Sequence, residues 1–387
     1  MIYLDYNATT PVDPRVNQAA RVWSVEQFGN PSSRDHAWGW DAADAVEESR
    51  QLLAESVHSL SAEITFTSSA TESLNTVIRS FTGYAGWEKR KIVTCATEHE
   101  AVLTPCRMMQ QAAGIEVEIL LVDRYGQIDL DQLKAAVSSR KEVLVALAAA
   151  NNEVGTISPI REIAHIAHTA GAWLLCDLTQ VVGKMPVDVR TDGIDLAAFS
   201  AHKIYGNKGV GALFVRGAKS GFNVQPLICG GGQERGLRGG TLNVPGIVGL
   251  GEACRIAAAE MQEESSRIRN LRDKLERAIL SQVPDTWVNG DMANRIGNTT
   301  NIGFRGVEAK TLIRDIHEIA VSSRAACSSG SNGPSHVLKA IGLTDDEAYS
   351  CIRFSLGRFT TEEEIDYTIG KVIASVHKLR RSKSVRV

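Results

Sequence analysis

The sequence lacks a cysteine framework and a strong charge bias. Its seven cysteines are an odd number and include no Cys-x-x-Cys pair, which argues against a disulfide scaffold and against a cysteine-based metal site. The formal net charge is only -3, so no overall basic field predicts direct nucleic-acid binding. Only the C-terminal end is basic, from Lys371 onward, and ends of this kind are usually just solvated.

Membrane-directed segments are missing as well. The first residues, MIYLD, contain neither the basic n-region nor the apolar h-region of a secretory signal. The longest apolar run, from Val143 to Ala150, is far too short to span a bilayer. We therefore expect a cytoplasmic protein with reduced thiols and no membrane association.

The chain does contain a regular alternation of strand-like and helix-like segments. This alternation predicts an α/β fold, with a largely parallel sheet covered by helices on both faces. Near residue 250 the pattern changes to two long charged helices, which we expect at Ile247–Ile256 and Glu260–Leu280. A smaller αβ region follows them.

The length of 387 residues is sufficient for two hydrophobic cores. We expect a large domain at residues 12–255. Residues 1–11 and 256–387 are expected to form a smaller domain.

A lysine and an aspartate each follow an apolar run that predicts a strand. One run leads into Ser200, His202 and Lys203, and an earlier run leads into Asp177. Pyridoxal phosphate requires this pair, because the lysine amine forms the Schiff base and the carboxylate keeps the pyridine nitrogen protonated. A lone lysine after a strand is usually a surface residue, but these polar groups together favour a cofactor site.

Further polar residues follow neighbouring strands. Ser68–Ser73 lies between a strand and a helix, where free N–H groups bind anions, although most such segments are ordinary helix caps. His99 and Asn152 each follow another strand, in places where a cap or a turn is the commoner role. Ligands of open α/β sheets collect outside the carboxyl ends of the strands, so these residues are expected to converge with Asp177 and Lys203.

Cys327 differs from most of the other cysteines because it lies in a loop rich in serine and glycine. Arg324 precedes it by three residues and favours the thiolate, which is the reactive form. Arg353 alternates with apolar residues in a predicted strand. It suits a bidentate clamp on a carboxylate about as well as it suits a strand-edge surface position.

These segments, in this order, resemble those of the cysteine desulfurases of the NifS/IscS-like group, pyridoxal-phosphate enzymes with the class V aminotransferase fold. The matching segments are Tyr3–Pro11, Phe28–Ser32, Asn151–Gly155, Gly230–Arg235, Arg238–Thr241 and Ile352–Thr360. The resemblance implies a fold type I architecture. Its large domain would contain a mostly parallel seven-stranded sheet, and its smaller α/β C-terminal domain would carry the catalytic cysteine loop.

The resemblance also implies a role for each candidate residue. Lys203 would carry the aldimine, His99 would stack on the ring and handle protons, and Cys327 would attack the substrate sulfur. The cofactor would be held by Ala70, Thr71, His99, Asn152, Asp177, Gln180, Ser200, His202, Lys203 and, from the other subunit of a dimer, Thr241. The substrate would be oriented by Asn7, Asn152 and Arg353.

The implied reaction converts L-cysteine to L-alanine and leaves a persulfide on Cys327. The implied partners are L-cysteine, a second subunit in a homodimer with a shared active site, and a sulfur-acceptor protein. The sulfur would serve iron–sulfur clusters or another thio-modification such as DNA phosphorothioation. No resident metal is expected, although Cys327 is a candidate for a transient cluster ligand.

Three departures from the pattern of the relatives concern sulfur delivery and rate rather than catalysis itself. They are the Arg-Ala-Ala sequence before Cys327, Leu178 beside the cofactor aspartate, and Asn207 where proline is common. One alternative is a selenocysteine or cysteine sulfinate lyase of the same fold. Another is a non-catalytic sulfur-relay scaffold, against which the intact Lys203 and Asp177 argue.

Overall fold

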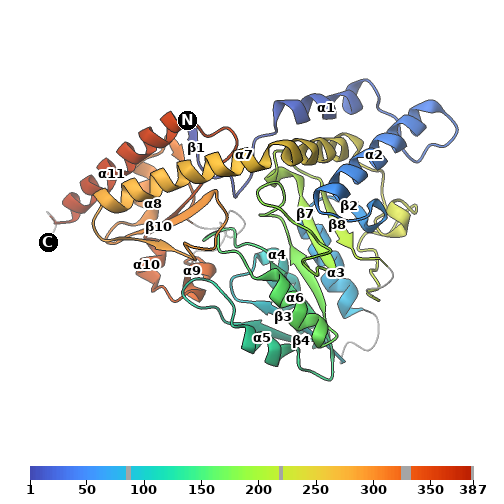
Figure 1. Ribbon diagram of the computed structural model, residues 1–387, viewed down its shortest axis with the longest axis horizontal. Helices are drawn as coiled ribbons and strands as arrows, with labels where there is room; N and C mark the ends of the chain where they lie inside the picture. Colours follow the sequence, from blue (N-terminus) through green and yellow to red (C-terminus); the bar gives the residue numbers. More distant parts are fainter. Residues whose placement is uncertain (84–88, 218–220, 324–332, 385–387) are drawn as a thin grey trace.

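The computed structural model describes residues 1–83, 89–217, 221–323 and 333–384. It divides into two lobes, which lie side by side beneath the long helix α7 (Val244–Gln282) (Figure 1). The large lobe contains a seven-stranded sheet and its helices, and the small lobe contains two smaller sheets and the C-terminal helices. No helix in the described ranges is long and apolar enough to cross a membrane.

The seven-stranded sheet confirms the predicted fold class. Its strand order is β2-β8-β7-β6-β5-β3-β4, and every pair is parallel except the two that β8 forms with its neighbours. In that order the strands are Ile64–Thr67, Gly211–Val215, Leu196–Ser200, Trp173–Asp177, Glu142–Ala148, Arg90–Cys95 and Glu116–Leu120. Most of them are buried along nearly their whole length because helices cover both faces.

Helices on both faces explain this burial. Successive residues of β7 belong to different cores: Ala197 and Phe199 pack on one face, and Leu196 and Ala198 on the other. The first face is covered by α2, α5 and α6, and the second by α3 and α4. The large-lobe helices are α1 (Pro14–Val25), α2 (Ala37–Ser56), α3 (Ala70–Thr82), α4 (Glu100–Ala113), α5 (Leu130–Val137) and α6 (Ile160–Thr169).

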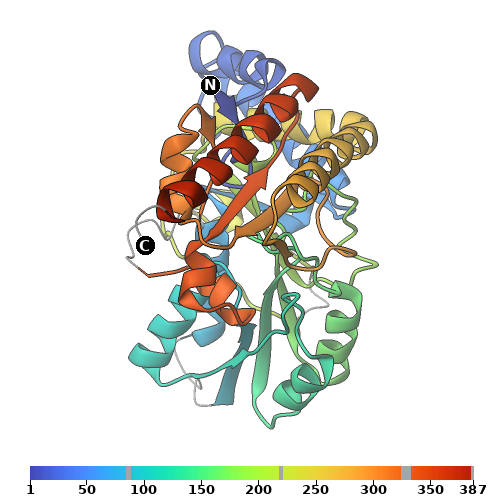
Figure 2. The ribbon, with the colours of Figure 1, turned by 90° about the vertical axis from the view of Figure 1, so that its left-hand side faces the viewer.

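The small lobe has its own apolar core, to which Leu4 from the N-terminal segment contributes. Its antiparallel sheet has the order β12-β10-β9 (Cys351–Ser355, Thr299–Phe304 and Thr286–Asn289), and β1 (Ile2–Tyr3) pairs in parallel with β11 (Ile319–Ala320). Its helices are α8 (Ala309–Asp315), α9 (His336–Ala340), α10 (Asp345–Tyr349) and α11 (Glu362–Ser384). Figure 2 shows α11 lying alongside the end of α7 on this lobe.

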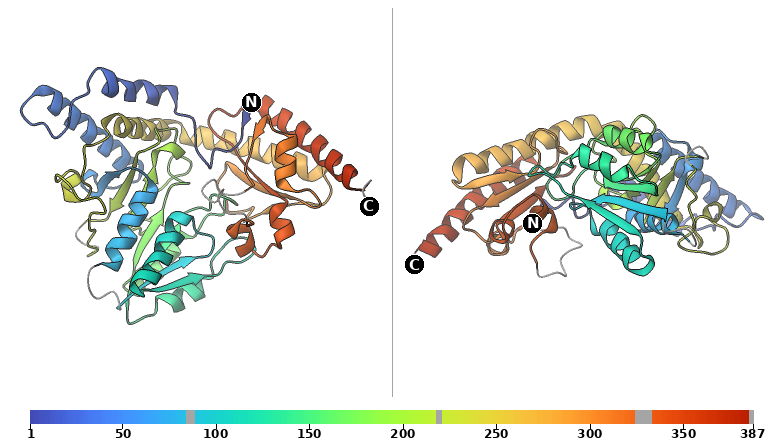
Figure 3. Two further views of the ribbon diagram at one scale, coloured as in Figure 1. Left: turned by 180° about the vertical axis from the view of Figure 1, so that it is seen from behind. Right: turned by 90° about the horizontal axis from the view of Figure 1, so that it is seen from below.

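Helix α7 corrects the prediction of two separate helices near residue 255. It is continuous from Val244 to Gln282 and extends over both lobes, as the view from behind shows (Figure 3). The expected break falls in Ala257–Ala259, and alanine is the best helix former. The buried face of α7 changes partner there: residues up to Ile256 pack in the core of the large sheet, and residues from Ile268 onward pack in the small lobe.

This change of partner explains why the pattern resembled two helices. The predicted domain boundary at 255 therefore lies inside a helix. The division into residues 12–255 and residues 1–11 plus 256–387 remains a prediction.

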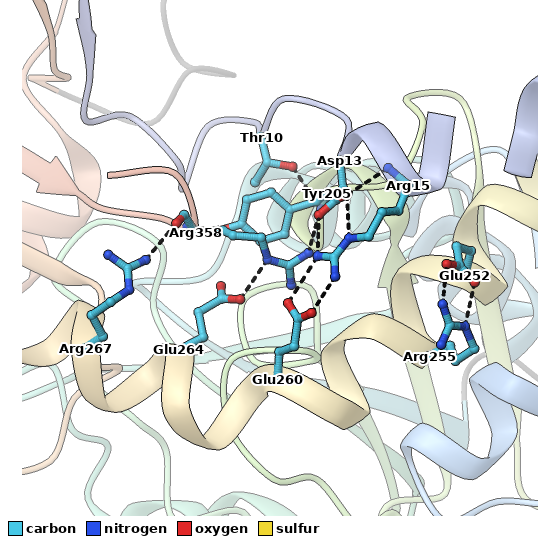
Figure 4. Close-up of polar contacts among 10 residues, drawn as sticks. All are labelled: Thr10, Asp13, Arg15, Tyr205, Glu252, Arg255, Glu260, Glu264, Arg267 and Arg358. Carbon is cyan, nitrogen blue, oxygen red and sulfur yellow. Dashed lines mark hydrogen bonds and ion pairs between the residues drawn. The ribbon is translucent and has the colours of Figure 1, made fainter. Parts of the chain in front are cut away.

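An ion-pair cluster joins the lobes beside α7 (Figure 4). Arg358 of the small lobe contacts Asp13 at 2.8 Å and Glu264 of α7 at 2.7 Å, and its guanidinium lies 4.3 Å from the centre of the Tyr205 ring. Asp13 also pairs with Arg15 at 2.9 Å. Because Arg358 and Asp13 are 345 residues apart in sequence, this cluster fixes the N-terminal segment between the lobes.

Tyr205 belongs to the same cluster and has an unusual backbone. Its φ of 67° is in the left-handed region, which is strained for a residue with a side chain. Three hydrogen bonds hold it there: its N–H donates to Thr10 Oγ1 at 3.0 Å, its carbonyl accepts from Asp13 N at 3.0 Å, and its hydroxyl accepts from Arg358 N at 2.6 Å. The cluster therefore fixes the turn that follows Lys203.

Candidate active site

A cavity opens at the carboxyl ends of the parallel strands, where the small lobe meets the sheet. It is lined by all but two of the predicted site residues: Asn7, Ala70, Thr71, His99, Asn152, Asp177, Gln180, Ser200, His202, Lys203 and Arg353. Asp177 and Ser200 end β6 and β7, and Arg353 comes from β12. The parallel topology brings the strand-end residues together, as expected.

Two predicted residues are not placed in this cavity. Thr241 is exposed on the surface of the chain and does not line it. Cys327, together with Arg324, lies outside the described residues. The roles of Thr241 and Cys327 therefore remain predictions.

One end of the cavity has the features of an anion site. Ser69 has an extended backbone and accepts a hydrogen bond from Glu72 N at 3.2 Å, so that α3 begins at Ala70. The first N–H groups of a helix have no partner within the helix and attract anions. Ser69 is thus an ordinary N-cap, and Ala70 and Thr71, which carry the first N–H groups of α3, line the cavity.

His202 lies at the same cavity as a neutral donor. Burial and the charge of Lys203 lower its pKa to about 4. Its Nδ1 lies 3.1 Å from Thr9 Oγ1 in the N-terminal segment. At neutral pH the imidazole therefore offers a hydrogen bond without a positive charge.

Asp177 is the last residue of β6 and keeps one oxygen available for a ligand. Its Oδ1 accepts from Thr179 N at 2.9 Å. Thr179 also lines the cavity, and its hydroxyl is buried with no hydrogen-bond partner among the described residues. A buried hydroxyl without a partner is costly, so its position indicates a polar ligand beside Asp177. Sequence reasoning missed Thr179, whose only signal is its closeness to Asp177.

Lys203 reaches the cavity from a short 3-10 helix (Ala201–Lys203) that directly follows β7. Its Nζ donates to the carbonyl of Ala8 at 2.7 Å and also to that of Asn7. The N-terminal segment is tied to the same turn, because Thr10 N donates to His202 O at 3.0 Å. The lysine amine is therefore oriented by backbone nearly 200 residues away, which no local pattern reveals.

His99 is the N-cap of α4 and also lines the cavity. Its Nδ1 accepts a hydrogen bond from Ala101 N at 3.0 Å, so the proton of the neutral ring resides on Nε2. His99 therefore caps a helix, and the cap fixes the tautomer of a ring at the cavity. Its role toward the cofactor remains a prediction.

Glu98 is a buried carboxyl that sequence reasoning also missed. Its Oε1 accepts from Ala148 N at 2.9 Å, and its Oε2 has no partner in the described part of the chain. Burial, with a contribution from the charge of Asp177, raises the pKa of Glu98 to about 7. It therefore holds the ends of β3 and β5 together largely as a neutral acid at pH values below 7.

Arg353 is fully buried between the lobes. It donates to Asn152 O at 2.8 Å and pairs with Asp5 at 2.5 Å, while its Nε has no partner among the described residues. The guanidinium is therefore fixed in place at the cavity wall. A fixed guanidinium with unused donor capacity suits recognition of a carboxylate.

The residues on either side of segment 324–332 are anchored close to this cavity. On one side, Arg353 N donates to Ser322 O at 2.7 Å. On the other, Ser335 Oγ donates to Glu153 at 2.6 Å, and His336 Nε2 lies 2.9 Å from Glu98 O. The described residues that flank 324–332 in the sequence thus lie beside residues of the site.

Comparison with known proteins now decides the family. The family model of class-V aminotransferases matches residues 2–368. The chain belongs to the class V aminotransferase family. Its cavity fits the pyridoxal phosphate that this family binds, with an anion site at one end, a carboxylate beside an unpartnered hydroxyl, and a lysine amine.

Individual relatives are similar over nearly the whole chain. A cysteine desulfurase IscS of Rickettsia bellii is 45% identical over 379 residues, which are 98% of this chain and 92% of the relative. A solved NifS-like protein is 36% identical with a TM-score of 0.88, covering 96% of this chain and 98% of the other. SspA, solved in complex with cysteine, is 33% identical with a TM-score of 0.80, covering 93% and 100%.

Proposed function

We propose that this class V family member is a pyridoxal-phosphate-dependent cysteine desulfurase, which converts L-cysteine to L-alanine and takes up the sulfur on Cys327. The observation that carries the proposal is the cavity itself, in which Lys203, Asp177 and the start of α3 meet Arg353 from the other lobe. The relatives named cysteine desulfurase, and the SspA structure with cysteine, support the substrate.

Different polar residues of the cavity would bind different parts of the cofactor. The N–H groups of Ala70 and Thr71, with Ser200 and His202, would hold the phosphate. Asp177 would keep a proton on the pyridine nitrogen, and Lys203 would bind the cofactor through its amine. Bound pyridoxal phosphate supplies an electron sink that stabilises carbanions of the substrate.

The substrate is oriented and protonated by other groups of the site. Arg353 and Asn152 would fix the substrate carboxylate, with Asn7 beside them. Because Nδ1 of His99 accepts a backbone hydrogen bond, Nε2 is the ring nitrogen that would give or take a proton. The lysine amine, once released from the cofactor, would move the other protons.

The transfer of sulfur from cysteine to Cys327 requires no external oxidant, because the substrate carbon takes the electron pair of the broken bond. The thiolate of Cys327 attacks the substrate sulfur, the carbon–sulfur bond breaks, and a sulfur–sulfur bond forms on the enzyme. The substrate carbon takes up a proton and leaves as alanine. Anchoring of Ser322 and Ser335 near Glu153 and Arg353 supports access of this segment to the cavity.

A homodimer with a shared site is part of the proposal. Aromatic side chains near the start of α2 are exposed in the single chain, among them Phe28, Trp38 and Trp40. Thr241 is exposed as well, which supports the proposal that it helps to hold the cofactor of a second subunit. Sulfur would pass to an acceptor protein in the cytoplasm, for iron–sulfur clusters or for another thio-modification such as DNA phosphorothioation.

The test is the intact mass of the purified holoenzyme after L-cysteine is added without reductant, followed by peptide mapping. We expect one added sulfur on the Cys327 peptide and alanine in solution. Cys327→Ser should abolish both, and Lys203→Ala should abolish alanine formation. If Cys327→Ser still releases alanine at the parent rate, the protein is a lyase of the same fold and the desulfurase proposal is wrong.

A further inference from the structure

Lys184 is a second lysine close to the cavity, and none of the roles above involves it. It lies in the turn after β6, where its carbonyl accepts from Ser265 Oγ of α7 at 2.7 Å and its N–H donates to Val181 O at 2.9 Å. The backbone of Lys184 is therefore fixed between the sheet and α7. Among the described residues, its ammonium forms no ion pair with a carboxylate.

The ammonium of Lys184 instead contacts a neutral amide of the site. Its Nζ donates to Oε1 of Gln180 at 2.8 Å. A lysine can only donate, so the oxygen of this carboxamide must face Lys184. The amide nitrogen then points the other way, and it donates to Asn7 O at 3.1 Å.

These contacts form a chain that ends at the cofactor lysine. The carbonyl of Asn7 accepts from Gln180 and also from Lys203. Gln180 lines the cavity, and the resemblance to cysteine desulfurases implies that it contacts the ring hydroxyl of the cofactor. A carboxamide rotated by 180° would present its oxygen to Asn7 O and to the cavity, which is a repulsive arrangement for the carbonyl.

We propose that Lys184 is a positioning residue, which fixes the carboxamide of Gln180 with its N–H groups toward the cofactor and holds a second positive charge beside Lys203. The inference rests on the proposed function only in that the cavity binds pyridoxal phosphate.

The electrostatic surroundings set the pH range in which Lys184 carries its charge, which is below about pH 7. Burial is the main reason that the pKa of Lys184 falls to about 7, and the charges of Lys203 and Arg353 lower it further. Glu264 of α7 opposes this shift, but its carboxylate is already engaged by Arg358 at 2.7 Å. By the same repulsion, a charged Lys184 disfavours a proton on the Lys203 nitrogen.

The experiment titrates the visible absorbance of the holoenzyme with pH in the absence of cysteine. Lys184→Met keeps most of the side-chain length but loses both the hydrogen bond and the charge. We expect the midpoint of the absorbance change to rise by about one pH unit, a tenfold gain in proton affinity. The affinity for added pyridoxal phosphate should fall several-fold.

Two further variants separate the hydrogen bond from the charge. Lys184→Gln keeps a donor, so we expect cofactor affinity close to that of the parent but a raised midpoint. Lys208→Met is the matched control for the absorbance midpoint, because it removes a charge from the turn after Lys203 without contacting Gln180, and it should leave the midpoint unchanged.

An unchanged midpoint in both folded, cofactor-loaded Lys184 variants would overturn the inference. If Lys184→Met fails to fold, Lys184→Gln decides the question of charge by itself. The titration requires no turnover, so a shifted midpoint in a protein that does not desulfurate cysteine contradicts only the proposed function. An unchanged midpoint in an active desulfurase contradicts only the role of Lys184.

Discussion

The turn from Lys203 to Tyr205 connects the cavity around Lys203 with the ion-pair cluster around Arg358, and both regions bury charged side chains. In the cluster, Asp13 contacts two guanidinium groups (Figure 4), and hydrogen bonds from Arg15 and then Arg358 hold its pKa far below the usual range. Glu98, which is buried beside the cavity, contacts no cation in the described structure, and its pKa is raised to about 7.

The contrast indicates which charges support the fold and which are available for chemistry. Paired ions satisfy each other and have little capacity left for a ligand, whereas shifted pKa values without an ion pair cluster at functional sites. Lys184 and Glu98 are of the second kind, although neither belongs to a recognised motif. Arg353 combines both kinds, because it pairs with Asp5 but leaves its Nε unused.

The largest effect is expected from breaking the cluster. Arg358→Ala leaves Asp13 and Glu264 without their shared partner, and Asp13 is only 1% exposed. Removing one partner from a buried ion pair typically costs about 3–5 kcal/mol of stability. Asp13 keeps its contact with Arg15, so the charge left without compensation is that of Glu264, and the loss should lie toward the lower end of this range. Urea unfolding of the holoenzyme monitored by far-UV circular dichroism measures the loss.

The neighbouring pair Arg255–Glu252 supplies the control for this prediction. Arg255 lies on α7, the helix that also carries Glu264 (Figure 4), but its side chain is 57% exposed. Exposed pairs contribute about 0–1 kcal/mol, so Arg255→Ala should have little effect on stability. Equal losses for Arg358→Ala and Arg255→Ala would remove the distinction between a buried cluster and ordinary surface pairs.

A smaller effect is expected at Arg353, where both kinds of charge meet. Arg353→Lys keeps the charge but loses the planar fork, which a single ammonium cannot replace at a bidentate site. A lost charge-assisted hydrogen bond costs about 1.5–3 kcal/mol, so KM for cysteine should rise roughly 10- to 100-fold. Steady-state alanine formation gives KM, and the cofactor absorbance should stay as in the parent. A parent-like KM would show that Arg353 serves only the fold.

The strand-end residues of the site could be predicted from the sequence, because they depend on local rules. Apolar runs identified the strands that end at Asp177 and Ser200, and parallel topology places such ends together. The start of α3 was predictable for the same reason, since small hydroxyl residues cap helices. These parts of the site require only patterns within a few residues.

The remaining contacts join segments that are distant in sequence. Lys203 donates to Asn7, which is 196 residues away in sequence, and Arg358 contacts Asp13, which is 345 residues away. No pattern within a few residues can predict such contacts. Lys184 is close to Asp177 in sequence, but a lysine in a turn is ordinary until its acceptor is known. Helix α7 was misjudged because its buried face changes from one core to another.

The smallest expected effect compares the buried carboxyl group of Glu98, which has no cation partner in the described structure, with that of Asp13, which has two. Its pKa in the folded protein is about 7, above the ordinary value of 4.5, so folding favours the protonated form. The stability that this form contributes is complete below about pH 4.5 and is lost as the pH rises through 7.

Glu98→Gln imitates the neutral acid at every pH and cannot ionise. The parent should therefore lose about 2 kcal/mol of stability relative to this variant between pH 5 and pH 7. Asp13→Asn is the opposite case, because the pKa of Asp13 is lowered by its guanidinium partners, and its stabilising contribution is lost only as the pH falls into the acid range. Urea unfolding at pH 5 and pH 7 measures the difference for Glu98→Gln, and over the same range the difference between Asp13→Asn and the parent should stay constant. A parent and a Glu98→Gln variant whose stabilities change in parallel over this range would mean that Glu98 is ionised in the fold, and that the cavity neutralises its carboxylate as the cluster neutralises Asp13.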